Sequence, residues 1–365
     1  MRITMARGEM LEALTTAGRA VSNRSTLPIL SGILISAKDD TATFQATDLE
    51  VSVRTKATAD VGDPGDAVIP GKIVSDIVRS LPEAAVTLSA DKDGGKVECG
   101  QAVFHLNTVS PEDFPKFPEI EADTEVSIPA EAFAALVKQV AKAVSRDETR
   151  PILTGVLTVV EGPVFRMVAT DSYRLAVREV TLEQSPGSDL EVVVPGRAVE
   201  EVPKLAGPAQ AIRMGISENQ VVFNAGDTTF VTRRIEGSFP NYRQLIQQDR
   251  DIAVTVGRDE LLEAVKRVSL LAQHNAALKV AVKAKEGTLS LSAATEGVGD
   301  AAEDLMVGVA GDDVELAFNH SFFADGVASV GTERLTMRLA TPMKSGTLES
   351  EGDEEFLYLL MPVRL

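Results

Sequence analysis

Two acidic triplets contain the side chains of this sequence that are best suited to chemistry. Ala46-Thr47-Asp48 recurs as Ala169-Thr170-Asp171, and a pair of carboxylates can act as general acid and general base in a hydrolase or lyase. An aspartate at the end of a strand also accepts backbone N–H groups in a turn. A structural turn is repeated with its domain, whereas an active site needs no second copy. The repetition therefore favours the structural interpretation of Asp48 and Asp171.

The sequence lacks the signatures of other catalytic chemistry. Its single cysteine, Cys99, excludes an internal disulfide and indicates a reducing compartment, and we expect it to fill space in a strand. The sequence contains no glycine-rich phosphate loop and no GxSxG turn. The three histidines are far apart and have no metal-binding companions: His105, His274 and His320. We therefore predict no catalytic residue, no metal and no cofactor.

The hydropathy of the sequence predicts no membrane partner. The first residues, MRITMARGEM, contain no apolar leader, and no apolar stretch approaches the length of a membrane span. Together with the single cysteine, this predicts a cytoplasmic location.

An internal repeat sets the domain organisation. Residues 20–48 align without a gap to residues 143–171, and they share a Pro-Ile-Leu block as well as the acidic triplet. Val68-Ile69-Pro70-Gly71-Lys72 also recurs, as Val193-Val194-Pro195-Gly196-Arg197. Each repeat has the length of a domain, and the remaining third of the chain has a similar order of elements. We expect three related domains, at residues 1–124, 125–249 and 250–365.

Apolar spacing predicts two helices in a typical domain. Apolar residues recur at helical period over 10–21, 129–146 and 261–271, and shorter helices are expected at 71–81 and 196–205. Pro203 is expected to truncate or kink the last of these. Between the helices the period becomes two, as in residues 49–54, 289–293 and 335–339, which predicts strands joined by Gly/Asp turns. The fold class is therefore α+β.

Three segments depart from the repeat. Residues 297–304 and 345–355 are acidic and are expected to be solvated loops. Residues 356–365 (FLYLLMPVRL) are so apolar that they must be docked or form part of a binding surface. In addition, Tyr173 and Arg174 follow the second triplet where the first repeat has Glu50 and Val51.

The net charge of −18 argues against a nucleic-acid partner unless the basic residues collect on particular surfaces. Several of them do fall on the polar faces of the predicted helices. On the helix expected at 129–146, for example, Lys138, Lys142 and Arg146 follow one another at intervals of four residues.

Four motifs, in this order and at these spacings, resemble a known family. They are Arg24–Leu30 (RSTLPIL), Thr170–Val177 (TDSYRLAV), Phe239–Tyr242 (FPNY) and Met361–Leu365 (MPVRL). Over essentially its whole length the chain resembles the bacterial DNA polymerase III beta subunits, the β sliding clamps. The resemblance implies a DNA-clamp fold: three similar domains, each with two helices packed on antiparallel sheets, in a head-to-tail ring dimer.

The same resemblance implies a non-enzymatic function and a set of partners. Such a homodimeric ring encircles duplex DNA without reading its sequence and confers processivity. It tethers the DNA polymerase III alpha subunit, other polymerases, the clamp loader and repair proteins through a short hydrophobic peptide motif.

Three groups of residues take roles from the resemblance. The basic residues expected to face DNA are Arg24, Lys72, Arg79, Lys138, Lys142, Arg146, Arg197, Lys204, Lys266 and Arg267. The residues expected to form the partner-peptide pocket are Leu153, Thr170, Ser172, Tyr173, Arg174, Leu175, Pro240, Leu245, Met343, Ser345, Leu359, Leu360, Met361, Pro362, Val363 and Arg364. The residues expected at the dimer interface are Phe104 and Leu106, facing Leu270 and Leu271, together with the acidic Glu303 and Asp304.

The chain departs from the family pattern at several of these positions. Ser172-Tyr173 stands where the pocket usually has Gly-His, and Gln244 replaces an arginine beside the Phe-Pro motif. Gln101 and Val103 replace basic interface residues, for which Lys72 is a candidate substitute.

Two other functions remain open at this point. The chain could be a clamp paralogue that acts as a decoy or resistance target. It could also be a hydrolase that uses acidic residues such as Asp48 and Asp171, although no nucleophile–base pair accompanies them.

Overall fold

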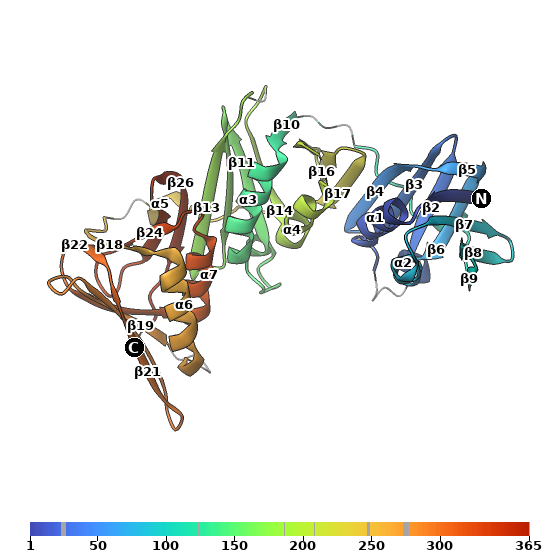
Figure 1. Ribbon diagram of the computed structural model, residues 1–365. Helices are drawn as coiled ribbons and strands as arrows, with labels where there is room; N and C mark the ends of the chain where they lie inside the picture. Colours follow the sequence, from blue (N-terminus) through green and yellow to red (C-terminus); the bar gives the residue numbers. More distant parts are fainter. Residues whose placement is uncertain are drawn as a thin grey trace. The chain divides into compact units, whose positions relative to one another are not determined.

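The structure is a computed structural model that describes residues 1–22, 27–120, 122, 124–185, 187–207, 209–246, 249–272 and 277–364. Arg24 and Leu365, which belong to the sequence motifs, and His274 lie outside the described residues. The chain forms two compact units (Figure 1). Unit 1 contains residues 1–133 and 197–234, and unit 2 contains residues 134–196 and 235–364.

Unit 1 is built on two antiparallel sheets. The described part of the smaller sheet has the order β5 (Asp60–Asp63), β1 (Arg2–Ala6), β7 (Ala85–Asp91), β8 (Gly94–Cys99), β9 (Ala102–Leu106). The larger sheet has the order β10 (Thr124–Pro129), β15 (Ala211–Ile216), β16 (Gln220–Ala225), β17 (Thr228–Arg233), β4 (Val51–Thr58), β3 (Thr41–Thr47), β2 (Gly32–Lys38), β6 (Gly65–Pro70).

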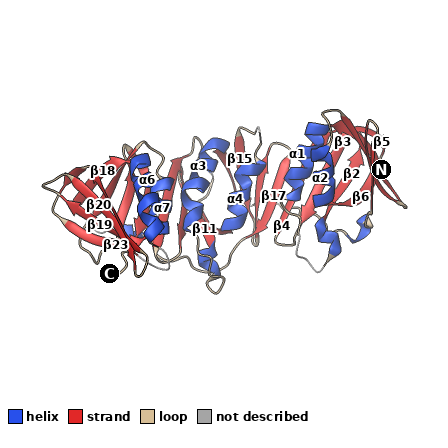
Figure 2. Cartoon of the chain, turned by 60° about the horizontal axis from the view of Figure 1, so that its bottom comes forward, coloured by secondary structure: helices blue, strands red, loops and turns tan. Residues whose placement is uncertain are grey.

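The helices of unit 1 are amphipathic and cover these sheets. Helices α1 (Arg7–Gly18) and α2 (Gly71–Ser80) lie side by side (Figure 2), and α4 spans Gly196–Leu205. The apolar residues of α1 recur every three or four positions, and Met10, Ala13, Leu14 and Ala17 are buried as this spacing predicts. Single 3₁₀ turns occur at Pro28–Ser31 and Pro111–Asp113.

Unit 2 repeats this plan. Its larger sheet has the order β14 (Leu190–Pro195), β11 (Gly155–Glu161), β12 (Val164–Thr170), β13 (Arg174–Thr181), β26 (Asp353–Leu360), β25 (Gly346–Ser350), β24 (Arg334–Leu339), β18 (Ile252–Gly257), β22 (Gly308–Ala310). The described part of its smaller sheet has the order β21 (Gly299–Met306), β20 (Thr288–Thr295), β19 (Ala277–Lys283), β23 (Val314–Asn319).

The helices associated with unit 2 include a neighbouring pair, α6 (Arg258–Val268) and α7 (His320–Ser329) (Figure 2). Helix α3 spans Ala130–Val140, and α5 is a single turn, Arg243–Ile246. Further 3₁₀ turns occur at Ala141–Ala143, Pro151–Thr154 and Ser269–Leu271.

Each large sheet joins strands from two neighbouring sequence repeats. In unit 1, β4 of the first repeat pairs with β17 of the second, and in unit 2, β13 of the second repeat pairs with β26 of the third (Figure 1). The compact units therefore differ from the three sequence domains, because each large sheet includes strands from two neighbouring sequence domains. The α+β class with antiparallel sheets and few helices is confirmed.

The structure corrects several expectations about local structure. The acidic segment 297–304 is mostly strand β21, in which the exposed Asp300, Ala302 and Asp304 alternate with the half-buried Ala301 and Glu303. The second acidic segment, 345–355, is mainly the hairpin of β25 and β26. Acidic side chains do not prevent strand formation where a neighbouring strand provides hydrogen-bond partners. The prediction of loops from the acidic composition of these two segments was therefore wrong.

Smaller corrections concern single residues. Helix α4 continues through Pro203 to Leu205 instead of ending before the proline. Leu49 lies in a turn with a φ of 77°, not in a strand. The helix expected over 129–146 ends at Val140 and continues only as a 3₁₀ turn to Ala143.

Within the described residues, no helix is both long enough and apolar enough to cross a membrane.

Candidate functional site

The two repeated aspartates form the same turn in the two units. Asp48 Oδ1 accepts the N–H groups of Glu50 (3.0 Å) and Val51 (2.7 Å). Asp171 Oδ1 accepts those of Tyr173 (2.9 Å) and Arg174 (3.0 Å). These contacts confirm the structural interpretation of both aspartates. We call the two loops the Asp48 turn (residues 47–51) and the Asp171 turn (residues 170–174).

Only the Asp171 turn carries a buried arginine. Arg174 Nε donates to Asp171 Oδ2 (3.0 Å), and its Nη1 donates to Asp325 Oδ2 (2.7 Å) on α7 and to the Tyr358 hydroxyl (3.2 Å) on β26. The guanidinium also lies over the ring of Phe322, 4.2 Å from its centroid. This network fixes the turn to two elements that lie far away in sequence.

Burial and charge have opposite effects on Arg174. Burial disfavours the guanidinium charge, but the hydrogen bonds that Arg174 donates to Tyr358 and Asp325, together with the Asp171 carboxylate, outweigh it and raise the pKa of Arg174. Burial also raises the pKa of the Tyr358 phenol above its ordinary value. Tyr358 therefore stays protonated at neutral pH, and its hydroxyl donates to the carbonyl of Phe322 (3.2 Å).

An apolar cluster underlies the Asp171 turn. Leu175 pairs with Leu359 across the β13–β26 junction, and both are buried. Leu360, the next residue, is also buried, so both residues belong to the core although they point to opposite faces of the sheet. The buried members of this cluster, which we call the apolar floor, are Leu157, Val159, Val168, Leu175, Val177, Val193, Tyr242 and Leu359.

Exposed apolar side chains from four segments belong to the same predicted pocket. Tyr173 of the Asp171 turn is 61% exposed and Met343, before β25, is 70% exposed. The backbone N–H of Met361 donates to the carbonyl of Tyr173 (2.8 Å), which brings the C-terminal segment to the turn. We call these exposed residues the rim: Tyr173, Leu245, Met343, Met361 and Val363.

The other predicted pocket residues differ in their surroundings. Leu153 and Thr170 are buried, and Ser172 Oγ accepts a hydrogen bond from Arg150 Nη1 (3.0 Å). Ser345 is buried, and its Oγ accepts a hydrogen bond from Arg250 Nη2 (2.9 Å). Pro240 and Arg364 are exposed and Pro362 is half-buried.

The described DNA-facing candidates are all exposed, but several have acidic neighbours. Ion pairs join Arg79 to Asp76 (2.7 Å), Lys204 to Glu201 (2.7 Å) and Lys266 to Glu263 (2.7 Å). Lys142 approaches Asp325 at 3.9 Å. The exposed candidates are Lys72, Arg79, Lys138, Lys142, Arg146, Arg197, Lys204, Lys266 and Arg267.

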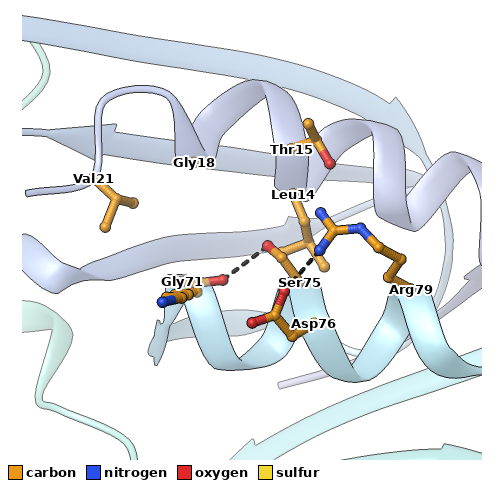
Figure 3. A pocket seen from close by; sticks show the side chains of 9 residues that line it. Leu14, Thr15, Gly18, Val21, Gly71, Ser75, Asp76 and Arg79 are labelled. Carbon is orange, nitrogen blue, oxygen red and sulfur yellow. Dashed lines mark hydrogen bonds and ion pairs between the residues drawn. The ribbon is translucent and has the colours of Figure 1, made fainter. Parts of the chain in front are cut away.

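A groove between α1 and α2 contains two of these basic residues. Its volume is about 270 Å³, and Lys72 and Arg79 line it together with Thr15 and Gly18 of the facing helix. Figure 3 shows Arg79 beside Asp76, with Thr15 on the opposite helix. The groove is therefore polar on the α2 side.

The residues expected at a dimer interface lie on two edge strands of the smaller sheets and in the 3₁₀ turn Ser269–Leu271. Phe104 and Leu106 are half-buried on the edge strand β9, and Glu303 and Asp304 lie on the edge strand β21. Leu270 is 69% exposed, and Leu271 is half-buried. Arg267 Nη2 donates a hydrogen bond to Glu303 Oε1 (2.6 Å), and this contact lowers the pKa of the Glu303 carboxyl. The structure thus pairs a predicted DNA contact with a predicted interface residue.

No group of three or more His, Cys, Asp or Glu side chains within the described part of the chain is arranged to hold a metal ion.

Sequence reasoning missed four residues that contact or adjoin the predicted pocket residues: Tyr242, Arg250, Asp325 and Tyr358. Tyr242 belongs to the FPNY motif, so its position was visible although its place in the apolar floor was not. Asp325 lies on α7, for which the repeat gave no motif. The one local signal was Asn319, whose side chain caps the helix by accepting the N–H groups of Ser321 (3.0 Å) and Phe322 (3.1 Å).

Comparisons with known proteins agree with this architecture. Family models of the DNA polymerase III beta subunit match the chain in three consecutive parts: the N-terminal domain at residues 1–118, the central domain at 127–241 and the C-terminal domain at 243–364. The "Beta sliding clamp" of Streptomyces coelicolor is 31% identical, with 100% of both chains covered.

Solved structures of sliding clamps have the same fold. The DNA polymerase sliding clamp from Bacillus subtilis matches with a TM-score of 0.93 and 30% identity, covering 100% of this chain and 99% of that one. A sliding clamp from Pseudomonas aeruginosa bound to griselimycin matches with a TM-score of 0.94 and 26% identity over 100% of both chains. The expected three-domain clamp fold is confirmed. The chain belongs to the family of DNA polymerase III beta subunits, the non-catalytic sliding clamps that confer processivity on DNA replication.

Proposed function

We propose that two copies of this chain close head to tail around duplex DNA, and that the rim and the apolar floor of unit 2 bind short peptides of replication and repair proteins. The observation that carries this proposal is the rim itself. Five large apolar side chains from four chain segments are exposed; the Met361–Tyr173 hydrogen bond joins two of these segments, and hydrogen bonds from Arg250 join the other two. Exposed apolar groups gathered at one place indicate a binding surface.

The chemistry of this surface suits an extended apolar peptide. A partner tail with a leucine and an aromatic residue would transfer both side chains from water to the rim residues. The proposed partners are the DNA polymerase III alpha subunit, other polymerases, the clamp loader and repair proteins. Because their tails are short and flexible, one pocket can serve several partners in turn.

The proposed DNA contact is electrostatic and independent of sequence. Lys138, Arg146 and Arg197 are exposed on or beside helices, where phosphates can reach them. The neighbouring ion pairs and the net charge of −18 weaken the attraction at long range. Weak contacts that carry no sequence information allow a ring to slide, and its closure rather than its affinity then retains it on DNA.

The proposed dimer joins the edge strands β9 and β21. Each lies at the edge of its sheet, so pairing β9 of one subunit with β21 of the other would continue the sheet across the interface. Phe104 and Leu106 would then meet Leu270 and Leu271. Two such head-to-tail contacts close a ring. We also propose that this ring acts in the cytoplasm.

A titration with a fluorescent peptide tests the pocket. The probe is a synthetic peptide that carries a leucine and a phenylalanine, and the variant lacks residues 361–365. This deletion removes Met361 and Val363 from the rim, together with the Met361–Tyr173 and Val363–Ala317 backbone hydrogen bonds. We expect affinity to fall by about 100-fold or more. Deletion of Leu365 alone is the matched control, because Leu365 is not among the residues expected to form the pocket, and native mass should show a dimer for both. Unchanged calorimetric affinity would contradict the pocket.

Retention on DNA tests the ring. After loading by a cognate clamp loader, nicked circular DNA should retain the protein, and cutting the circle should release it. Equal release from both forms, or a monomer at micromolar concentration, would contradict the ring. Failure of a cognate loader to load it would favour the decoy paralogue.

A further inference from the structure

Arg250 connects two segments of the chain that each carry a rim residue. It follows α5 by a few residues, and its guanidinium reaches both α5 and the loop before β25. Its Nη1 donates to the Ile246 carbonyl (3.2 Å), and its Nη2 donates to the Leu245 carbonyl (3.1 Å). On the other side, Nε donates to the Ser345 carbonyl (3.0 Å), and Nη2 donates to Ser345 Oγ (2.9 Å).

The two connected segments are unequal in how firmly the core holds them. Ser345 is 3% exposed and precedes Gly346, which pairs with Leu360 in the sheet. Helix α5 is a single turn, and none of its four residues, all of which the structure describes, is fully buried. Apolar packing alone therefore anchors α5 less firmly than the loop that faces it. The hydrogen bonds from Arg250 supply part of what the packing lacks.

The geometry suits arginine and not lysine. A guanidinium presents five N–H donors in a planar fork, so it can satisfy acceptors on two sides at once. An ammonium group is a single point and cannot span the same set of acceptors. Arg250 is itself half-buried, and this burial lowers the pKa of its guanidinium. Its contacts with protein oxygens offset the loss of water.

We infer that Arg250 is a positioning residue of the peptide pocket: it fixes the spacing between Leu245 on α5 and Met343 beside Ser345, and so determines which apolar side chains the pocket accepts. Leu245 and Met343 are both exposed, so they are free to contact a ligand. A pocket with fixed spacing binds two anchors of a peptide together, whereas a pocket with a mobile wall binds each anchor more independently. The inference rests on the proposed peptide-binding function.

The test is a peptide titration with variants of Arg250 in the full-length protein. Arg250→Lys keeps the charge but loses the fork, and Ser345→Ala removes one acceptor and keeps the carbonyl. Arg178→Lys is the matched control, because Arg178 joins β13 to β26 through Asp353, four residues beyond Arg174 in the strand. The probes are a fluorescent peptide with one leucine and one phenylalanine, and two versions in which either anchor is replaced by alanine.

We expect Arg250→Lys to weaken binding of the intact peptide about tenfold and Ser345→Ala about threefold, mostly through a faster off-rate. Arg178→Lys should change the affinity by less than about twofold. The double variant Arg250→Lys/Ser345→Ala should bind no more weakly than Arg250→Lys alone, because the two residues share one contact. The penalty for removing one peptide anchor should be smaller in Arg250→Lys than in the wild type. We call the affinity for the intact peptide divided by the affinity for a peptide without one anchor the anchor ratio. A merely structural role of Arg250 would leave the anchor ratio unchanged.

The outcomes separate this inference from the pocket itself. If the wild type binds the peptide but Arg250→Lys binds equally well, the positioning role is overturned and the pocket stands. An unchanged anchor ratio, or an equal loss in Arg178→Lys, overturns it as well. If the wild type binds none of the peptides, the proposed pocket fails, and the inference fails with it.

Discussion

The β4–β17 junction of unit 1 and the β13–β26 junction of unit 2 have the same backbone and different side chains. In both, an aspartate turn leads into the first strand of the pair, β4 or β13. A backbone N–H from the partner strand, or from the residue after that strand, donates to a carbonyl of the turn. Arg233 N–H donates to the Glu50 carbonyl (3.3 Å) in unit 1, and Met361 N–H donates to the Tyr173 carbonyl (2.8 Å) in unit 2. The two junctions are thus two copies of one structural template.

The side chains at equivalent positions account for the difference. In unit 2 the paired positions Leu175–Leu359 and Val177–Leu357 are apolar. The equivalent pairs in unit 1 are Ser52–Val231 and Arg54–Thr229. Arg54 also lies over the ring of Phe117, 4.2 Å from its centroid, where it adds charge to that surface. The proposed pocket of unit 2 therefore differs from the equivalent part of unit 1 in a few side chains, on an equivalent strand pairing.

Tyrosine fluorescence reports on the unfolding of unit 2 alone. The three tyrosines, Tyr173, Tyr242 and Tyr358, all lie in unit 2, and the chain has no tryptophan. Stability in unit 1 can be followed by hydrogen exchange of the β3 and β4 amides.

The largest effect is expected when the apolar floor receives a unit 1 side chain. Leu175→Ser should destabilise unit 2 by about 3 kcal/mol or more, because it leaves a cavity and buries a hydroxyl. Peptide binding should be lost at concentrations that saturate the wild type. Urea unfolding followed by tyrosine fluorescence measures the first effect, and peptide titration measures the second.

The matched variant in unit 1 is Ser52→Ala. It removes only the hydrogen bond from Ser52 Oγ to Thr47 Oγ1 (2.8 Å), so a loss of about 1 kcal/mol is expected there. Wild-type peptide affinity in Leu175→Ser would show that the apolar floor does not support binding.

A smaller effect should distinguish the two aspartate turns. Asp171→Asn removes a charge that faces the buried Arg174, and we expect unit 2 to lose about 2 kcal/mol, with Asp325 remaining as the second counter-charge. Asp48→Asn keeps an acceptor oxygen, and no buried cation lies beside Asp48 among the described residues, so a loss of about 0.5 kcal/mol or less is expected in unit 1. Urea unfolding and hydrogen exchange compare the two. Equal losses would mean that Arg174 does not depend on Asp171.

The smallest effect concerns the residues with positive φ in the two turns. Leu49 has a φ of 77° and Ser172 a φ of 80°, values that glycine adopts more easily. Leu49→Gly should stabilise unit 1 by about 0.5 kcal/mol by relieving strain. Ser172→Gly relieves the same strain but loses the hydrogen bond from Arg150, so its net effect on unit 2 should be close to zero. Hydrogen exchange measures the stability change of Leu49→Gly in unit 1. Thermal unfolding monitored by tyrosine fluorescence measures the change of Ser172→Gly in unit 2. A clear gain in Ser172→Gly would show that the Arg150 contact contributes little.

Features that were repeated in the sequence were predictable from it. The aspartate turns and the α2 and α4 helices follow from recurring blocks such as Val68–Lys72 and Val193–Arg197, whereas the third domain was expected from its similar length and order of elements. Elements without a repeated motif, such as helix α7 and strand β21, were not predicted from the sequence. The pairing of β21 with β20 depends on tertiary context that local composition does not contain.

The candidate site was predictable in its location and not in its support. Tyr173 and Arg174 could be located because they break the repeat. The contact of Arg174 with Asp325 joins residues 151 positions apart, and a single sequence carries no signal for such a pairing. The same holds for Arg250 and Ser345, which are 95 positions apart.

The strand pairing across repeats has a consequence for biosynthesis. Strand β4 ends at Thr58, but its partner β17 begins only at Thr228. A similar length of chain separates the end of β13 at Thr181 from the start of its partner β26 at Asp353. At typical translation rates the ribosome needs roughly 10 to 30 s to make the intervening residues. During that time the nascent chain exposes an unpaired strand edge, and in unit 2 this edge includes Leu175 and Val177. Protection of these edges by a chaperone, or slow translation of the last repeat, should therefore affect the yield of folded protein more than any single surface substitution.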